Sequence, residues 1–225
     1  ALADAITGQY AALAILAALT ERGDRGKGRL IDISMLEAMS HFHLDSFTHY
    51  YSVGEIMGPL SRPSVSQSYT FECADGRWVA IHMSSPPKFW EGLVAAVEMP
   101  ELLNDPRFAE RLERIEHQQD LIDVLSPVFK MRPRDAWCAA LLANEVPHSP
   151  AYDADEALED AQARHLRIKV TTQHPTVGEF TTVRAPYHFD GEPEFDLLAP
   201  PVLDEHGAEL RAELRARQQP DLTSD

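Results

Sequence analysis

The chain has 225 residues, 44% of them hydrophobic, which is enough to build one large or two small cores. Its 36 acidic and 20 basic residues give a net charge of −16, which opposes binding to nucleic acid and to anionic membrane surfaces. We therefore expect neither as a partner. The two cysteines, Cys73 and Cys138, are far apart and form no CxxC pattern, so we expect reduced core thiols in a cytoplasmic protein.

The chain opens with a helix pattern in which Tyr10 to Leu19 are mostly small and apolar on every side. Such a helix is typically covered all round by protein, and the run is shorter than the roughly 20 residues that cross a membrane. We expect a core helix over about residues 5 to 22, closed by Gly23. Asp4 lies at its start, where free backbone N–H groups favour a carboxylate. Asp4 can be a simple N-cap or a catalytic group, with Gly8 leaving room for a ligand.

Strand and helix patterns alternate after this first helix. Leu30 to Ser34 alternates like a short strand, and Ser34 with Glu37 forms the capping-box pattern that begins a second helix. This alternation predicts an α/β fold. The basic segment Asp24 to Gly28 contains glycines but lacks the spacing of a phosphate loop, so we expect a solvated turn there.

The second helix carries the densest group of potential metal ligands, His41, Asp45 and His49, with His43 nearby. These three positions share one helical face, and two histidines with a carboxylate could form a triad for iron or zinc. At 1.5 Å per residue, however, the outer pair would lie about 12 Å apart on a straight helix, too far for one ion. We therefore expect a polar stripe and no metal site.

Residues 52 to 68 are rich in Gly, Ser and Pro and indicate a boundary. Beyond it, the pattern predicts a hairpin that turns at Asp75-Gly76, followed by helices in which Trp90 and Trp137 belong to the core. A cap at Ser84 or Ser85 would begin the first of these helices. The elements expected after the hairpin are helices near 87–97, 112–129, 136–143 and 155–164, strands near 168–172 and 179–183 joined by a turn at His174, and a surface helix over 205–217.

The motifs of the chain follow one another in a specific order, although none is specific alone. They are Asp4 to Gly8, Ala17 to Arg22, Gly26 to Gly28, Ile31 to Ala38, Pro59 with Arg62 and Pro63, Asp75-Gly76, Phe89-Trp90, Asp105 to Phe108, Val146-Pro147, His174-Pro175 with Gly178, Ala199 to Pro201, and Glu205-His206. This order and spacing resemble the class III CoA-transferases, the family of formyl-CoA transferase, carnitine CoA-transferase and 2-methylacyl-CoA racemase.

The resemblance implies an enzyme that moves CoA between carboxylic acids through an aspartyl-CoA thioester. Asp4 falls on the family's nucleophilic aspartate, and Gly8 would contribute to substrate binding. Coenzyme A would enter as an acyl-CoA substrate, a carboxylic acid would accept it, and no metal would take part. The family also implies a homodimer, or association with the part of its fold that precedes this aspartate.

The resemblance also implies an α/β fold that forms the C-terminal part of the family's architecture. Residues 1–55 would be a large-domain segment with a linking helix, 66–150 a small α+β domain, and 151–225 a return to the large domain with a C-terminal helix. Some members place a glycine-rich lid near Ser64 to Ser68, but the glycine run is absent here, so no lid is assigned. Asp204 stands where the family usually has glycine.

Two alternatives remain open. A 2-methylacyl-CoA racemase uses an aspartate at this position as an acid/base group, although Ala5 to Gly8 is more similar to the transferases. The chain could also be an inactive assembly subunit that needs an N-terminal partner for any chemistry.

Overall fold

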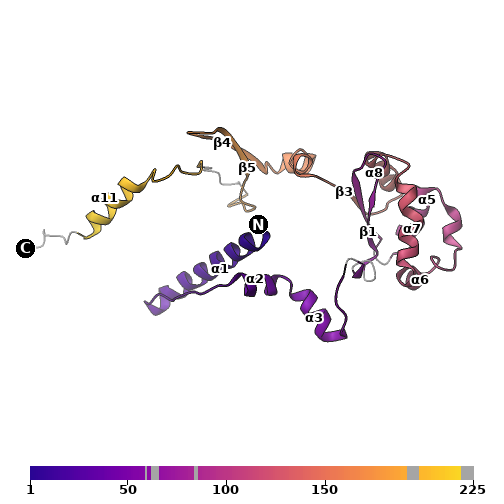
Figure 1. Cartoon of the computed structure of the whole chain (residues 1–225), viewed down its shortest axis with the longest axis horizontal. Helices are drawn as coiled ribbons and strands as arrows, with labels where there is room; N and C mark the ends of the chain where they lie inside the picture. Colours follow the sequence, from indigo (N-terminus) through magenta and orange to yellow (C-terminus); the bar gives the residue numbers. More distant parts are fainter. Residues whose placement is uncertain (59, 62–65, 84–85, 192–197, 219–225) are drawn as a thin grey trace, which may run out of the picture. The chain divides into compact units, whose positions relative to one another are not determined.

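The computed structural model describes residues 1–58, 60–61, 66–83, 86–191 and 198–218. It contains two compact units, Ala1–Pro150 and Ala151–Asp225, whose elements are labelled in Figure 1. Both units combine helices with antiparallel strands. The mixed helix and strand content agrees with the predicted class, whereas the further domain boundary expected between residues 55 and 66 stays a prediction.

Helix α1 (Leu2–Arg25) is longer at both ends than the sequence predicted. It continues through Gly23 and ends at Gly26, whose φ of 68° lets its backbone N–H reach the Arg22 carbonyl oxygen at 2.8 Å. Asp4 is not the N-cap, because Ala1 occupies that position without a side-chain hydrogen bond. The predicted interpretation of Asp4 as a cap is therefore wrong.

The segment after α1 runs without a strand to α2 (Met35–Phe42), so the strand expected at residues 30–34 is wrong. Ser34 caps α2 as predicted: its Oγ accepts from the Glu37 backbone N–H at 3.2 Å and lies 2.6 Å from the Glu37 carboxylate. The second helix is broken at His43, which has φ −93° and ψ 24°, and α3 (Leu44–Val53) follows.

Helix α1 packs against α2, and this contact positions its first half. Ile6 and Ala38 are each only 5% exposed. The Tyr10 hydroxyl lies 2.6 Å from His41 Nδ1, and the two rings meet edge to face with centroids 5.4 Å apart. One face of α1 is thus held by α2 through one apolar and one polar contact.

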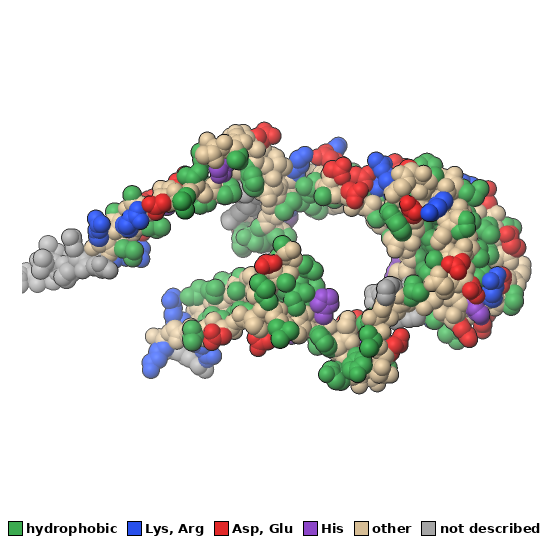
Figure 2. Space-filling view, in the orientation of Figure 1, with side chains coloured by type: hydrophobic (Ala, Val, Ile, Leu, Met, Phe, Trp, Pro, Cys, Tyr) green, Lys and Arg blue, Asp and Glu red, His purple; other side chains and the backbone are tan. Residues whose placement is uncertain are grey.

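The other described side chains of α1 are exposed or half-buried, so the expectation of a helix buried all round is wrong for this chain. Leu13, Ile15, Leu16 and Leu19 are between 46% and 63% exposed, and Figure 2 shows hydrophobic side chains gathered along this helix. A single neighbouring helix can cover only one stripe of such a surface. By length and composition alone, Leu2–Gly23 is also long and apolar enough to cross a membrane.

The small core of the first unit is built on a three-stranded sheet. Strands β1 (Ser68–Glu72) and β2 (Trp78–His82) form the predicted antiparallel hairpin, and β3 (His148–Ala151) is the third strand beside β2. The turn at Asp75-Gly76 uses a φ of 73° at Gly76, which glycine adopts without strain. Tyr69 and Phe71 point into the core while Thr70 between them is exposed, as strand geometry requires.

Helices complete the core of this unit beside the sheet. They are α5 (Pro87–Val97), the short 3-10 helix η1 (Pro100–Leu103), α6 (Arg111–Glu116), α7 (Gln118–Phe129) and α8 (Arg134–Ala143). The single helix expected over 112–129 is divided at His117. Pro86 is the N-cap of α5, and the caps predicted at Ser84 and Ser85 lie outside the described residues.

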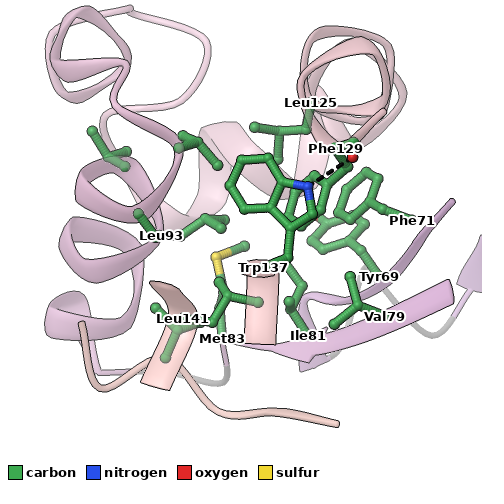
Figure 3. Packing of buried hydrophobic residues seen from close by; sticks show 14 of the residues in the cluster. Tyr69, Phe71, Val79, Ile81, Met83, Leu93, Leu125, Phe129, Trp137 and Leu141 are labelled. Carbon is green, nitrogen blue, oxygen red and sulfur yellow. Dashed lines mark hydrogen bonds between the residues drawn. The ribbon is translucent and has the colours of Figure 1, made fainter. Parts of the chain in front are cut away.

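Aromatic side chains form the centre of this core (Figure 3). Phe71 and Phe129 stack with centroids 4.4 Å apart, and Trp137 lies 4.7 Å beyond. The indole N–H of Trp137 donates to the Phe129 carbonyl oxygen at 2.7 Å, so its one polar atom is satisfied. Trp90 is 4% exposed and Trp137 1%, which confirms both as core residues.

Arg114 is a buried cation beside this aromatic cluster. Its guanidinium donates to Gln67 Oε1 at 3.0 Å and to the carbonyl oxygens of Phe108 and Ala109 at 2.6 and 2.9 Å. It also lies over the Trp90 ring, 4.7 Å from the centroid. Burial lowers the pKa of Arg114, and these contacts compensate for the lost hydration.

The second unit consists of α9 (Ala154–Ala157), α10 (Ala161–His165), the antiparallel pair β4 (Lys169–His174) and β5 (Gly178–Val183), and α11 (Gly207–Gln218). His174 Nδ1 accepts from the backbone N–H groups of Thr176 and Val177, which confirms its predicted place in the turn. Asp204 has a φ of 59°, a conformation that favours glycine. Asp204 therefore adopts a backbone conformation that glycine would take with less strain.

Candidate active site

Asp4 lies in the first turn of α1 and its side chain is exposed. The first turn of a helix has free backbone N–H groups and a partial positive charge of about half an electron, which stabilises a carboxylate. The N-cap is Ala1, and no side-chain hydrogen bond caps the helix there. Asp4 is therefore an ionisable residue in the first turn of α1 that does not occupy the cap position.

The face of α1 that carries Asp4 points away from α2. At 100° per residue, Asp4, Gly8, Ile15 and Leu19 fall on one side of the helix, roughly opposite Ile6. Ile6 is the residue buried against α2, whereas Ile15 is 50% and Leu19 46% exposed. A carboxylate thus stands at one end of an open apolar stripe, which we call the Asp4 face.

Gly8 lies one helical turn after Asp4, on the same face. Apart from its chain neighbours and the backbone of its own helix, no atom of the described residues lies within 4 Å of the point where a Cβ on Gly8 would stand. Its φ is not positive, so backbone geometry does not require glycine here. Glycine in a helix interior lowers stability by about 0.5–1 kcal/mol relative to alanine. Because it has no side chain, Gly8 also leaves open space beside the Asp4 carboxylate.

The structure does not bring the suspected metal ligands together. The helix break at His43 places His41 in α2 but Asp45 and His49 in α3. His41 is held by the Tyr10 hydroxyl, and His49 Nε2 lies 3.4 Å from Glu55 Oε2. Across the described residues, no group of three or more His, Cys, Asp or Glu side chains is arranged to hold a metal ion.

Sequence reasoning missed one contact that supports this region. The sequence places Tyr10 in the apolar run and His41 in a polar stripe, yet the Tyr10 hydroxyl and His41 Nδ1 form a hydrogen bond. The usable signal was spacing, because Tyr10 lies four residues after Ile6 and therefore on the face that packs against α2.

Residues 1–207 match the family model described as CoA-transferase family III. Among curated relatives, the chain is 27% identical to succinyl-CoA–D-citramalate CoA-transferase from Chloroflexus aurantiacus, over 98% of this chain and 55% of that protein. It is 26% identical to formyl-CoA:oxalate CoA-transferase from Streptomyces avermitilis, over 93% and 55%. It is 23% identical to human succinyl-CoA:glutarate CoA-transferase, over 95% and 49%. The chain thus spans about half the length of these relatives.

Solved structures give the same result for the fold. A CAIB/BAIF family protein from Brucella suis superposes with a TM-score of 0.80 at 29% identity, covering 95% of this chain and 55% of that one. Rv3272 from Mycobacterium tuberculosis superposes with a TM-score of 0.69 at 20% identity, over 92% and 54%, a likeness of fold alone. The family match covers most of the chain, and the chain belongs to CoA-transferase family III.

Proposed function

We propose that the chain carries the catalytic aspartate of an enzyme that transfers CoA from one carboxylic acid to another. The observation that carries the proposal is the position of Asp4, exposed in the first turn of α1 with open space beside it at Gly8. The substrates would be an acyl-CoA and a free carboxylic acid, as in the names of the three relatives.

In the first half of the proposed reaction, an Asp4 carboxylate oxygen attacks the thioester carbonyl of the donor. The carbon–sulfur bond breaks and leaves a mixed anhydride and the CoA thiolate. The thiolate then attacks the Asp4 carbonyl carbon, breaks the anhydride carbon–oxygen bond, and releases the donor acid. The product is an aspartyl-CoA thioester.

In the second half, the acceptor carboxylate attacks this thioester and expels the thiolate, which forms a second anhydride. The thiolate attacks the acceptor's acyl carbon, so the new acyl-CoA leaves and the Asp4 carboxylate is restored. A carboxylate is a weak nucleophile when hydrated, so the reaction needs a site from which water is excluded.

The exposed Asp4 face suggests that a partner binds there and excludes water from Asp4. Contiguous exposed apolar surface usually marks a site of interaction. We propose that protein covers it, either a second copy in a homodimer or the part of the family fold that this chain does not contain. A protein partner fits better than a membrane, since the match to CoA-transferase family III begins at residue 1 and so includes α1. Within this proposal the enzyme is cytoplasmic, which agrees with two thiols that form no disulfide.

The test is transfer of CoA from succinyl-CoA to glutarate or oxalate, measured with the chain alone and with the N-terminal part of a full-length relative added. Asp4→Ala should abolish transfer, while Asp32→Ala, a matched exchange at another carboxylate before α2, should retain it. Full activity of Asp4→Ala would refute the assignment.

The exposed Asp4 face also favours the second candidate, an assembly subunit without activity of its own. In that case the chain would bind its partner through α1 but transfer no CoA in any combination. Asp4→Ala would then leave both binding and the absence of activity unchanged.

A further inference from the structure

The small core of the first unit carries a cavity of about 730 Å³ on its sheet. Leu60, Ile122 and residues from all three strands line it, among them Ser68, Ala80, His82 and His148. The volume lies within the roughly 300–1,000 Å³ that is usual for sites that bind small molecules.

Strand register explains why polar groups meet in this cavity. Ser68 is paired directly across from His82 in the β1–β2 hairpin, so both project from the same face of the sheet. That face is opposite the core, because the alternating neighbours Tyr69 and Ile81 are buried.

A chain of hydrogen bonds orients the first histidine. Ser66 Oγ lies 2.8 Å from Ser68 Oγ, and Ser68 Oγ lies 2.6 Å from His82 Nδ1. When each hydroxyl donates to the next group, His82 Nδ1 accepts, and its Nε2 carries the proton. His82 Nε2–H is then available to donate to a ligand.

His148 is oriented by the backbone at the start of β3. Its Nδ1 lies 2.8 Å from the Val146 carbonyl oxygen, and because a carbonyl only accepts, Nδ1 carries a proton. In the neutral ring its Nε2 therefore accepts a hydrogen bond, so it can share the proton of a carboxyl group. The cavity thus holds two imidazole groups, each fixed through one ring nitrogen.

The other lining groups limit what can bind. No Asp, Glu, Lys or Arg is among the described residues that line the cavity, although the chain has a net charge of −16. Within this described lining, a cation meets no carboxylate and a phosphate-rich anion meets no Lys or Arg. The walls formed by Leu60, Ala80 and Ile122 suit a short aliphatic group.

We propose that this cavity binds a short aliphatic carboxylic acid, with its carboxyl group between His82 and His148 and its tail against Leu60 and Ile122. The site does not use Asp4 and is additional to the proposed transfer reaction. It is a binding site, and no covalent step takes place there.

The test is an NMR titration of the full chain with sodium butyrate, followed through the ring C–H signals of its 10 histidines. Two histidine rings should shift in a saturable way, and His82→Ala and His148→Ala should each remove one of these signals. Each substitution should weaken butyrate binding about tenfold, because each removes a hydrogen bond to a charged group. His206→Ala, at an exposed histidine elsewhere in the chain, should leave it unchanged.

Butylamine has an aliphatic tail with a positive charge, and inorganic phosphate is an anion without a tail. Neither should produce saturable shifts of these two histidine signals. The same titration of Asp4→Ala should match the unsubstituted chain, which separates this proposal from the transfer reaction. Binding that survives loss of both histidines, binding of phosphate as tight as that of butyrate, or no saturation at all would overturn the proposal. Circular dichroism of each variant shows that loss of binding is not loss of fold.

Discussion

Tyr69 contributes a polar atom to the small core that finds no hydrogen-bond partner within the part of the chain that the structure describes. The residue is 5% exposed. Burial raises the pKa of the Tyr69 hydroxyl to about 12, although the positive charge of Arg114 opposes this rise. The folded state therefore holds Tyr69 protonated at pH values where the unfolded chain releases the proton.

Removing this hydroxyl in Tyr69→Phe should leave the free energy of unfolding at pH 7 unchanged or raise it by up to about 1 kcal/mol, since an unpaired buried hydroxyl costs desolvation energy. The measurement is urea denaturation. Tyr152→Phe is the control, because that exposed hydroxyl donates to Asp160 Oδ2 at 3.1 Å. A loss of more than about 1.5 kcal/mol in Tyr69→Phe would show that the hydroxyl is paired.

The pH dependence of Tyr69 has a definite sign. Its folded-state pKa of about 12 lies above the ordinary value of 10, so its contribution to stability is complete below pH 10. That contribution is lost as pH rises from 10 to 12. Denaturation across this range should show the free energy of unfolding falling less steeply in Tyr69→Phe than in the unsubstituted chain, and equal slopes would contradict the shifted pKa.

Two glycines inside helices, Gly92 and Gly8, differ in how closely other atoms pack around them. A Cβ on Gly92 in α5 would collide with the Asn144 carbonyl oxygen, a backbone atom that cannot swing away, and would crowd Val146. A Cβ on Gly8 in α1 would meet no atom within 4 Å among the described residues outside its own helix backbone and chain neighbours. The first glycine is needed where α5 packs closely on the end of α8, whereas the second is not needed for packing in this chain.

Gly92→Ala should therefore destabilise the chain by about 1–3 kcal/mol, as overpacking does. Gly8→Ala should stabilise α1 by about 0.5–1 kcal/mol, because alanine is the better helix former. Chemical denaturation measures the effect of Gly92→Ala, and helical circular dichroism on heating follows the effect of Gly8→Ala.

If a substrate approaches Gly8, the same Gly8→Ala variant should lose CoA transfer while gaining stability. A Gly8→Ala variant that lost stability would indicate a contact at that face.

At the scale of elements, local patterns predicted what local physics decides. Turn chemistry, capping and periodicity predicted several features that the structure confirms. They are the hairpin around Asp75-Gly76, the cap at Ser34, the turn at His174 and the core positions of Trp90 and Trp137. Boundaries were less predictable. The breaks at His43 and His117 leave the apolar spacing almost unchanged, so periodicity alone could not locate them.

The sequence could not predict how much of α1 is exposed, for a different reason. Its apolar composition shows that the helix needs cover, but it does not say which polypeptide provides the cover. Asp4 shares this limit: its role as nucleophile was suggested by the family's motif order, and its position in the first turn of an exposed face was not visible in the sequence. The role itself stays a prediction.

For the whole molecule, the Asp4 face predicts association. The unsubstituted chain should sediment as a dimer or larger species, or bind the N-terminal part of a relative, because Ile15 and Leu19 are about half exposed. The double variant Ile15→Glu with Leu19→Glu should sediment at the mass of one chain. Leu112→Glu, at a leucine of α6 that is 73% exposed, is the control and should associate normally.

An unsubstituted chain that sediments as a monomer and captures no N-terminal part would contradict the proposed role of this face. A double variant that associates as well as the unsubstituted chain would place the interface elsewhere. Circular dichroism of α1 in the double variant is needed beside the sedimentation data, since added charge must not unfold the helix.

The central claim is that Asp4 becomes covalently linked to CoA, and trapping that link tests it most directly. The chain, supplied with the N-terminal part of a relative, would be incubated with succinyl-CoA, treated with hydroxylamine, digested and analysed by mass spectrometry. The account predicts a hydroxamate on the peptide that contains Asp4, on no other carboxylate, and absent without succinyl-CoA or in Asp4→Ala. Modification of a different aspartate or glutamate, together with CoA transfer by Asp4→Ala, would contradict it.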